Sequence, residues 1–101
     1  MRIIVLFNLK PGVAVTDYEA WARGMDIPGV NALTSVYDYT VHRATGLFGS
    51  DAKSPYDYVE VIDITNLDHF IADVSDPAFQ SIVAAFGQFA DNPTFMLTED
   101  L

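Results

Sequence analysis

The sequence predicts an α+β fold in which a four-stranded antiparallel sheet carries helices on one face. The segments with strand and helix signals follow one another as strand, helix, strand, strand, helix, strand, the order of the split βαβ, or ferredoxin-like, arrangement. The chain has 101 residues and is 50% hydrophobic, which suits one domain over residues 1–101 built on one core. Several predicted strands are apolar on both faces, which favours pairing of two copies.

The first strand and the first helix have the clearest boundaries. Residues 3–9 are rich in β-branched and aromatic side chains and end at the turn sequence Lys10-Pro11-Gly12, so they predict a strand. Thr16 and Glu19 have the spacing of a capping box, in which each side chain hydrogen-bonds a free backbone amide of the first turn. A helix is therefore expected to start at Asp17.

That helix is expected to run to about Gly24. Pro28 and Gly29 are expected to break the chain before a short helical turn at residues 30–33. Residues 36–45 mix aliphatic, aromatic and polar side chains in alternation, so they predict the second strand.

The second half of the chain repeats the pattern of strand, helix and strand. Residues 56–64 predict a third strand, which forms a hairpin with the second across the Gly/Ser-rich loop at residues 46–55. The predicted spatial order of the strands is four, one, three, two.

The second helical region has two start signals. Asn66 is expected to cap its first part, and Asp76-Pro77 supplies a second N-cap with proline at the first helical position. The region is expected to break near Ser75, to resume through about Phe89 and to end at Asn92-Pro93, before a last strand at residues 94–98.

The two-sided apolar pattern of the strands predicts a homodimer. Two helical regions cover only one face of a sheet, and a second copy placed sheet to sheet about a two-fold axis is the simplest cover for the other. The alternative is a monomer that tolerates exposed apolar area. The strand residues assigned to the two faces are Ile3, Val5, Phe7 and Leu9 against Ile4 and Leu6, and Val59 and Val61 against Tyr58, Ile62 and Ile64.

Composition excludes several classes of function. The chain has no cysteine, so it has no disulfide, thiolate nucleophile, iron–sulfur cluster or cysteine-based zinc site. A net charge of −9 would repel polyanions, so neither nucleic acid nor a membrane surface is expected as a partner. No apolar run approaches the ~20 residues of a membrane span, and a cytoplasmic location is expected.

Four polar residues on the predicted strands suggest a site. Glu60 shares a strand face with aromatic and aliphatic neighbours, so it needs a partner or has a raised pKa. We expect Asn8, His42, Tyr58 and Glu60 to converge, with His42 as general acid/base, Glu60 orienting it, and Asn8 and Tyr58 holding a substrate carbonyl. The alternative is that His42 is a solvated strand residue.

Other candidates lie on the helices. A functional interpretation places Asp26 and Trp21 at the pocket rim, where Asp26 would handle protons, but for Trp21 a buried helix stripe is the preferred interpretation. Arg23 is a candidate for substrate binding and is also spaced to pair with Asp26 on the surface. His69 is either catalytic or satisfies the first turn of its helix, and Phe86 is core or pocket wall.

Two histidines without ligand spacing predict no metal site, and no phosphate loop or dinucleotide motif is present, so cofactor-free chemistry on a small molecule is expected.

Short stretches of the chain resemble one known group. They are the N-terminal run Met1 to Val13, Tyr18-Glu-Ala-Trp-Ala-Arg, the segment from Asp26-Ile-Pro to Val36, and Arg43-Ala-Thr-Gly. They resemble the RedY-like, or HapK-like, group of the dimeric α/β barrel superfamily, over nearly the whole chain. The block from Trp21-Ala-Arg to Asp26-Ile-Pro is the part most particular to that group.

The resemblance implies a homodimeric barrel from prodiginine-type (prodigiosin) pigment pathways, acting on the bipyrrole branch of this secondary metabolism. The implied chemistry is a cofactor-independent cyclising condensation with loss of water that forms a pyrrole ring, the work of a cyclase or dehydratase. Acid/base residues in an apolar pocket suit such proton transfers. Two alternatives stay open: a cofactor-free monooxygenase acting on an aromatic intermediate, and a non-catalytic binder of a reactive pathway intermediate.

Overall fold

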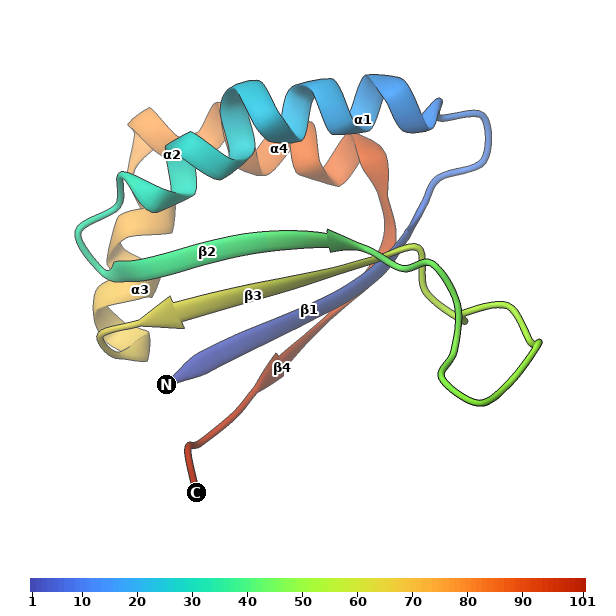
Figure 1. Cartoon of the computed structure of the whole chain (residues 1–101). Coiled ribbons are helices and arrows are strands. Elements are labelled where there is room, and N and C mark those ends of the chain that lie inside the picture. Colours follow the sequence, from blue (N-terminus) through green and yellow to red (C-terminus); the bar gives the residue numbers. More distant parts are fainter.

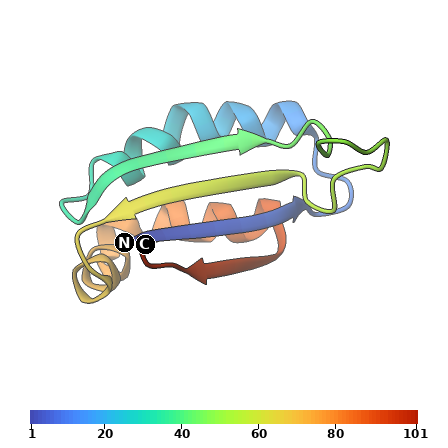
Figure 2. The same ribbon diagram turned by 60° about the horizontal axis from the view of Figure 1, so that its bottom comes forward.

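The sheet forms from the four segments richest in β-branched and aromatic residues. The structure, a computed structural model, describes residues 1–101. Its strands are β1 (Arg2–Leu9), β2 (Val36–Arg43), β3 (Tyr58–Ile64) and β4 (Ala90–Leu97), all antiparallel to their neighbours. They lie in the order β2-β3-β1-β4, which confirms the predicted order read from the other edge. The chain ends both lie at one end of the sheet (Figure 2).

All helices lie on one face of the sheet, as predicted (Figure 1). None of them has the length and apolar character needed to cross a membrane. In chain order they are α1 (Val15–Trp21), the π-helical turn η1 (Ala22–Asp26), α2 (Ile27–Asn31), α3 (Leu67–Ser75), the 3₁₀ turn η2 (Pro77–Phe79) and α4 (Gln80–Phe89).

The core lies between the helices and the sheet. Side chains alternate along each strand, so every second strand residue points to the helices, and most of these are buried there, whereas Phe95 and Leu97 of β4 are exposed. The buried strand residues on that face are Ile3, Val5, Phe7, Val36, Tyr39, Tyr58, Glu60, Ile62, Ile64 and Ala90. Glu60 is the one charged side chain in this set.

The opposite face of the sheet has no helix over it. Ile4, Leu6, Val59 and Val61 lie there half-buried, and Met96 is exposed. The prediction of apolar residues on a second face that no helix covers is therefore confirmed for β1 and β3, while β2 adds the polar Thr40 and His42 to that face.

The predicted capping box at the start of α1 was wrong. The helix begins at Val15 after Ala14, and no side chain caps it. Glu19 is buried and points to the sheet, where it binds Arg43 and Tyr58. For the buried Glu19 carboxylate, hydrogen bonds from Arg43 and Tyr58 are more favourable than a capping hydrogen bond at the exposed first turn of the helix.

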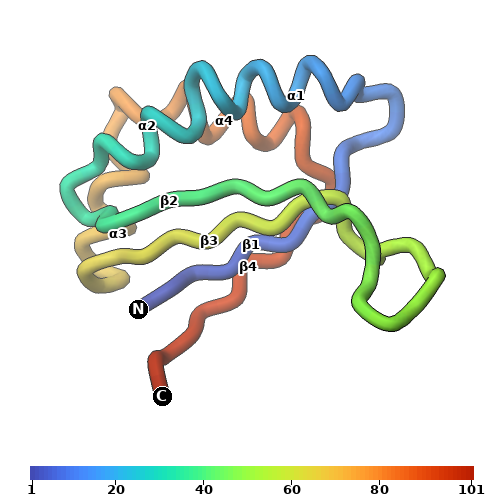
Figure 3. Tube along the Cα trace, in the orientation of Figure 1, coloured from blue at the N-terminus to red at the C-terminus, as the bar shows by residue number.

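The predicted break at Pro28-Gly29 was also wrong, because the helix continues from α1 through η1 into α2 without a gap (Figure 3). The Ile27 amide bonds the Ala22 carbonyl, five residues earlier. Proline lacks an amide hydrogen, and it is tolerated in the first turn of α2 because the wide η1 turn has already interrupted the regular hydrogen-bond pattern.

The last strand starts four residues earlier than predicted, at Ala90 rather than residue 94. Asn92 has φ of 47°, and the pairing of β4 with β1 shifts register between Leu6 and Asn8. Asn92-Pro93 therefore forms a bulge within the strand instead of ending the helix. Proline is allowed there because β4 is an edge strand. The start signals at Asn66 and Asp76-Pro77 are confirmed by side-chain caps.

Candidate active site

Two acidic side chains lie in the wall of an apolar cavity between the helices and the sheet. Asp26 is the last residue of η1 and Glu60 is central in β3, and they are only 3% and 4% exposed. The cavity has a volume of about 240 Å³. Its remaining lining is aromatic or aliphatic: Val30, Tyr39, Ile62, Phe70, Val74, Phe79, Ile82, Val83, Phe86 and Phe95.

The hydrogen bonds of these two carboxyl groups differ. The Tyr39 hydroxyl, from β2, donates to Asp26 Oδ2 over 2.7 Å. Glu60 Oε2 is buried and has no hydrogen-bond partner. A buried polar atom without a partner is costly, so its presence in a cavity wall points to a bound group that supplies the missing bond.

Burial shifts both carboxyl groups toward the neutral form. Burial, and then the nearby charge of Asp26, raise the pKa of Glu60 to about 8. Burial also raises the pKa of Asp26 to about 6, against the opposing effect of the Tyr39 hydrogen bond. Near neutral pH the pair therefore holds one proton on Glu60 and one negative charge on Asp26, the separation that acid/base catalysis uses.

A second carboxylate, Glu19 of α1, forms a separate cluster. Its Oε2 accepts from Arg43 Nε and from the Tyr58 hydroxyl, both over 2.7 Å, and its Oε1 accepts from Arg23 over 3.2 Å. The hydrogen bonds from Arg43, then that from Tyr58, lower the pKa of Glu19 to about 2. This group stays ionised and ties α1 to the end of the β2–β3 hairpin.

The predicted convergence of His42 with Glu60 was wrong. In β2, Tyr39 and Arg43 contact helix residues, whereas Thr40 and His42 lie on the open face, where His42 Nε2 contacts Thr40 Oγ1 over 2.9 Å. Glu60 faces the helices, so the sheet itself separates it from His42. The prediction compared positions along the strands but did not fix the register between β2 and β3, which pairs Glu60 with Val41.

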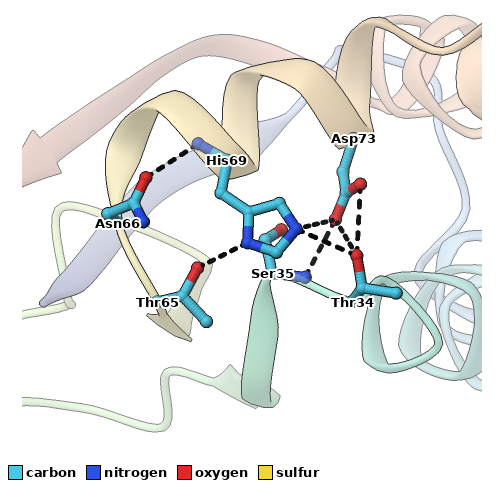
Figure 4. A network of polar contacts seen from close by, with 6 residues as sticks. All are labelled: Thr34, Ser35, Thr65, Asn66, His69 and Asp73. Atoms are coloured by element: carbon cyan, nitrogen blue, oxygen red, sulfur yellow. Dashed lines mark hydrogen bonds and ion pairs between the residues drawn. The ribbon is translucent and has the colours of Figure 1, made fainter.

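His69 belongs to a structural network at the start of α3 (Figure 4). It does not line the cavity. Its Nδ1 contacts Thr65 Oγ1 over 2.9 Å and its Nε2 contacts Thr34 Oγ1 over 3.0 Å. Asp73 accepts from the Ser35 amide over 2.9 Å, and hydrogen bonding from Ser35 lowers the pKa of Asp73. These contacts attach α3 to the loop before β2, so they support the structural alternative for His69.

The predicted substrate-binding residues fall into three places. Phe86 lines the cavity. Tyr58 and Arg23 belong to the Glu19 cluster, and Trp21 packs on Tyr18 and Phe89 with ring centroids 6.1 and 5.3 Å apart. Asn8 holds the loop before β3, donating to the Pro55 carbonyl and accepting from the Asp57 amide. Arg23 pairs with Glu19 rather than with Asp26.

Sequence reasoning missed three residues near the two carboxylate centres. Tyr39 and Arg43 alternate with Val41 along β2, so a fixed register would have placed them on the helix face with Glu60. Tyr18 was not considered as a site residue, yet its ring is fully buried and its hydroxyl has no partner.

Comparison with known proteins decides the family. The sequence model of the family described as REDY-like protein HapK matches residues 1–101. The chain belongs to the HapK family. The crystal structure of HapK from Hahella chejuensis is similar to this HapK family member, with 30% sequence identity and a TM-score of 0.74 over 98% of this chain and 93% of that one.

Two more distant structures share the fold of this HapK family member. A dimeric ferredoxin-like protein of unknown function from Thermobifida fusca has 22% identity and a TM-score of 0.72, over 94% of this chain and 85% of that one. SnoaB, a cofactor-independent oxygenase from Streptomyces nogalater, has 15% identity and a TM-score of 0.70, over 99% and 93%. Curated protein sequences gave no significant match. The fold is thus that of the ferredoxin-like dimeric α/β barrel proteins.

Proposed function

We propose that this HapK family member is a small cofactor-independent biosynthetic enzyme that uses Asp26 and Glu60 for acid/base catalysis. The observation that carries the proposal is the unpartnered carboxyl of Glu60 in the wall of an apolar cavity, beside a second buried carboxyl. Such a pair has one group ready to donate a proton and one ready to accept it near neutral pH.

The reaction that this arrangement suits is a cyclising condensation with loss of water, which forms a pyrrole ring in a bipyrrole pathway of the prodiginine type. Addition of an amine to a carbonyl leaves a hydroxyl group on the carbon. Glu60 donates its proton to this hydroxyl, and the carbon–oxygen bond then breaks to release water. The Asp26 carboxylate then removes a proton from nitrogen or carbon as the double bond forms. The apolar walls keep bulk water from reversing the step.

A mass-resolved assay of the purified protein with linear pyrrole precursors tests this function. We expect a product lighter by one water, and Glu60→Gln should lower turnover by about a hundredfold or more because it removes the acid without changing its shape. Glu99→Gln, the same change on an exposed residue near the C-terminus, is the matched control and should keep full turnover. His42→Gln should also retain turnover, since His42 lies on the other face of the sheet.

Other results would contradict the proposal. Gain of oxygen by the substrate would identify a monooxygenase, an activity that the name of SnoaB states for that protein. Saturable binding without any change in ligand mass would identify a binder of a pathway intermediate. Full activity of Glu60→Gln with loss of activity in His42→Gln would move the chemistry to the open sheet face.

We also propose that two copies pair through that open face. Its half-buried aliphatic residues, including Ile4 and Val61, form a surface without a cover in the single chain. The similar protein from Thermobifida fusca is described as dimeric, which supports the same arrangement here. In this arrangement each subunit keeps its own cavity, since the cavity lies on the helix side.

A further inference from the structure

The cavity beside Asp26 and Glu60 carries negative charge that the protein does not balance. These two are the only charged residues in its lining, which holds no lysine, arginine or histidine. Arg23 and Arg43 bind Glu19 and line a different cavity, of about 90 Å³. A buried charge needs a partner of opposite charge or a strong donor.

The geometry of the pair shows where that partner would bind. Asp26 Oδ2 already receives the Tyr39 hydroxyl, whereas Glu60 Oε2 has no donor although Glu60 is only 4% exposed. Apart from Asp26 and the Tyr39 hydroxyl, which donates to Asp26, the rest of the lining is aliphatic or phenylalanine and offers this oxygen no hydrogen-bond donor. A ligand N–H would fill the open position.

The aromatic lining favours the same kind of ligand. Four phenylalanine rings line the cavity, contributed by α3, η2, α4 and β4: Phe70, Phe79, Phe86 and Phe95. Aromatic rings attract cations at their faces and bind flat unsaturated rings by stacking. Val83 and Phe95 are 44% and 57% exposed, so the cavity reaches the surface between α4 and β4.

We propose that this cavity selects a ring-bearing ligand with a positively charged nitrogen, an amine or iminium group, and places that nitrogen against Glu60 and Asp26. The inference rests on the proposed function, since it names the substrate class of the same site. An anionic ligand would meet like charge, and a neutral apolar ligand would leave Glu60 Oε2 without a partner. During the proposed condensation the same carboxylates would stabilise an iminium intermediate.

Three indole compounds of nearly equal shape test the selection by titration calorimetry. Tryptamine carries an ammonium group at neutral pH, tryptophol a neutral hydroxyl, and indole-3-acetate a carboxylate. We expect tryptamine to bind roughly tenfold or more tightly than tryptophol, because it bonds a charged acceptor, and indole-3-acetate to bind more weakly than both. Glu60→Gln and Asp26→Asn should each reduce the preference for tryptamine, and Glu99→Gln should retain it.

Proton release on ligand binding is a second measurement, and a purely structural role of Glu60 would not affect it. The ionisable groups facing Glu60 are Asp26 from η1, Tyr39 from β2 and Tyr18 from α1, while α2, α3, η2, α4 and β4 contribute apolar side chains. A bound cation favours the ionised form of Glu60, so tryptamine should release protons at pH 7. Calorimetry in two buffers of different ionisation enthalpy measures that release, which Glu60→Gln should abolish.

Equal affinity for tryptophol and tryptamine, or tighter binding of indole-3-acetate, would overturn the inference. These outcomes are distinct from failure of the proposed function. Loss of water from pyrrole precursors without any preference for cationic ligands would support the proposed enzyme and contradict the proposed selection of cations. Preference for cationic ligands and proton release without any turnover would support the selection of cations and contradict the proposed enzymatic function.

Discussion

The Tyr39 hydroxyl is one of the groups that set the protonation of the two buried carboxyl groups. It donates to Asp26 and stabilises the ionised form of that group, and the resulting negative charge raises the pKa of Glu60. The phenol itself stays protonated, because burial and the nearby carboxylates raise its pKa. Burial raises the pKa of both groups, and this hydrogen bond to Asp26 together with the charge of Asp26 favours the proton on Glu60.

Removing that hydroxyl should change the pH profile of catalysis. The wild-type profile of kcat/KM should be bell-shaped, rising as Asp26 ionises near pH 6 and falling as Glu60 ionises near pH 8. In Tyr39→Phe the Asp26 carboxylate loses its donor, so its pKa rises and the acid limb moves to higher pH. Steady-state kinetics from pH 5 to about pH 9 would show this shift. An acid limb unchanged from wild type would show that the Tyr39 hydroxyl does not influence the pKa of Asp26.

The same pair makes stability depend on pH in an unusual direction. Both folded-state pKa values lie above those of the unfolded chain, so the folded protein binds more protons between about pH 4 and pH 8. The free energy of unfolding that the pair contributes is fully present below that window and is lost as pH rises through it. Glu60→Gln lacks the titrating group and should be the more stable protein at pH 9, by a few kcal/mol.

Urea unfolding of wild type and Glu60→Gln at pH 5, 7 and 9 measures this difference. Glu99→Gln is the control, since its exposed side chain contributes little in either state. Glu19 has a depressed pKa and affects stability only at lower pH, so it does not obscure the comparison. If the two proteins lost stability in parallel from pH 5 to 9, Glu60 would not titrate in this window.

The sequence predicted part of this site and not the rest. Glu60 could be identified because a carboxylate alternating with aromatic and aliphatic residues must be buried or paired. Asp26 was expected near a pocket, although no pattern indicated that its partner would be Tyr39. The role given to His42 required the register between β2 and β3, and a one-residue difference places a side chain on the other face.

At the scale of elements, the close packing of α2 on α4 shapes the cavity. Gly29 of α2 has no side chain, and a Cβ at this position would overlap the Cδ1 atom of Ile82, which lines the cavity. Gly29→Ala should therefore push Ile82 toward the cavity. The cost of moving one flexible methyl group is offset by the better helix propensity of alanine, worth about 1 kcal/mol.

The expected result for Gly29→Ala is nearly unchanged stability with weaker ligand binding. Thermal unfolding gives the first quantity, and the affinity for tryptamine gives the second. Gly24→Ala is a matched control in the same helical segment, because nothing lies within 4 Å of the Cβ that it adds. Equal ligand affinity in both variants would show that Ile82 does not limit the cavity.

The fold was more predictable than the boundaries of its elements. Strands and helices were expected in the observed order, because the chain alternates between periods typical of strands and of helices. Glu19 has the right spacing for a cap, but Arg43 and Tyr58 lie far along the chain and bind it instead. Pro93 suggested a boundary, yet an edge strand with a bulge accommodates it.

At the scale of the whole molecule, the open sheet face should determine assembly. Light scattering at micromolar concentration should give about twice the chain mass of 11.1 kDa. Val61→Lys places a charge on that face beside Ile4, its neighbour across the β1–β3 pair, and should shift the mass toward the monomer. A lysine in place of the exposed Val15 of α1, V15K, is the control and should leave the mass unchanged. A monomeric wild-type protein would contradict the predicted pairing.

The central claim is that the Glu60 carboxyl stays protonated in an apolar cavity near neutral pH. Carbon-13 NMR of carboxyl-labelled glutamate, with Glu60→Gln used to assign the resonance, measures its titration directly. The account predicts a midpoint near pH 8, lowered when tryptamine occupies the cavity. A midpoint near 4.5, the ordinary value for glutamate, would show that the carboxyl is solvated and would remove the basis of the proposed chemistry.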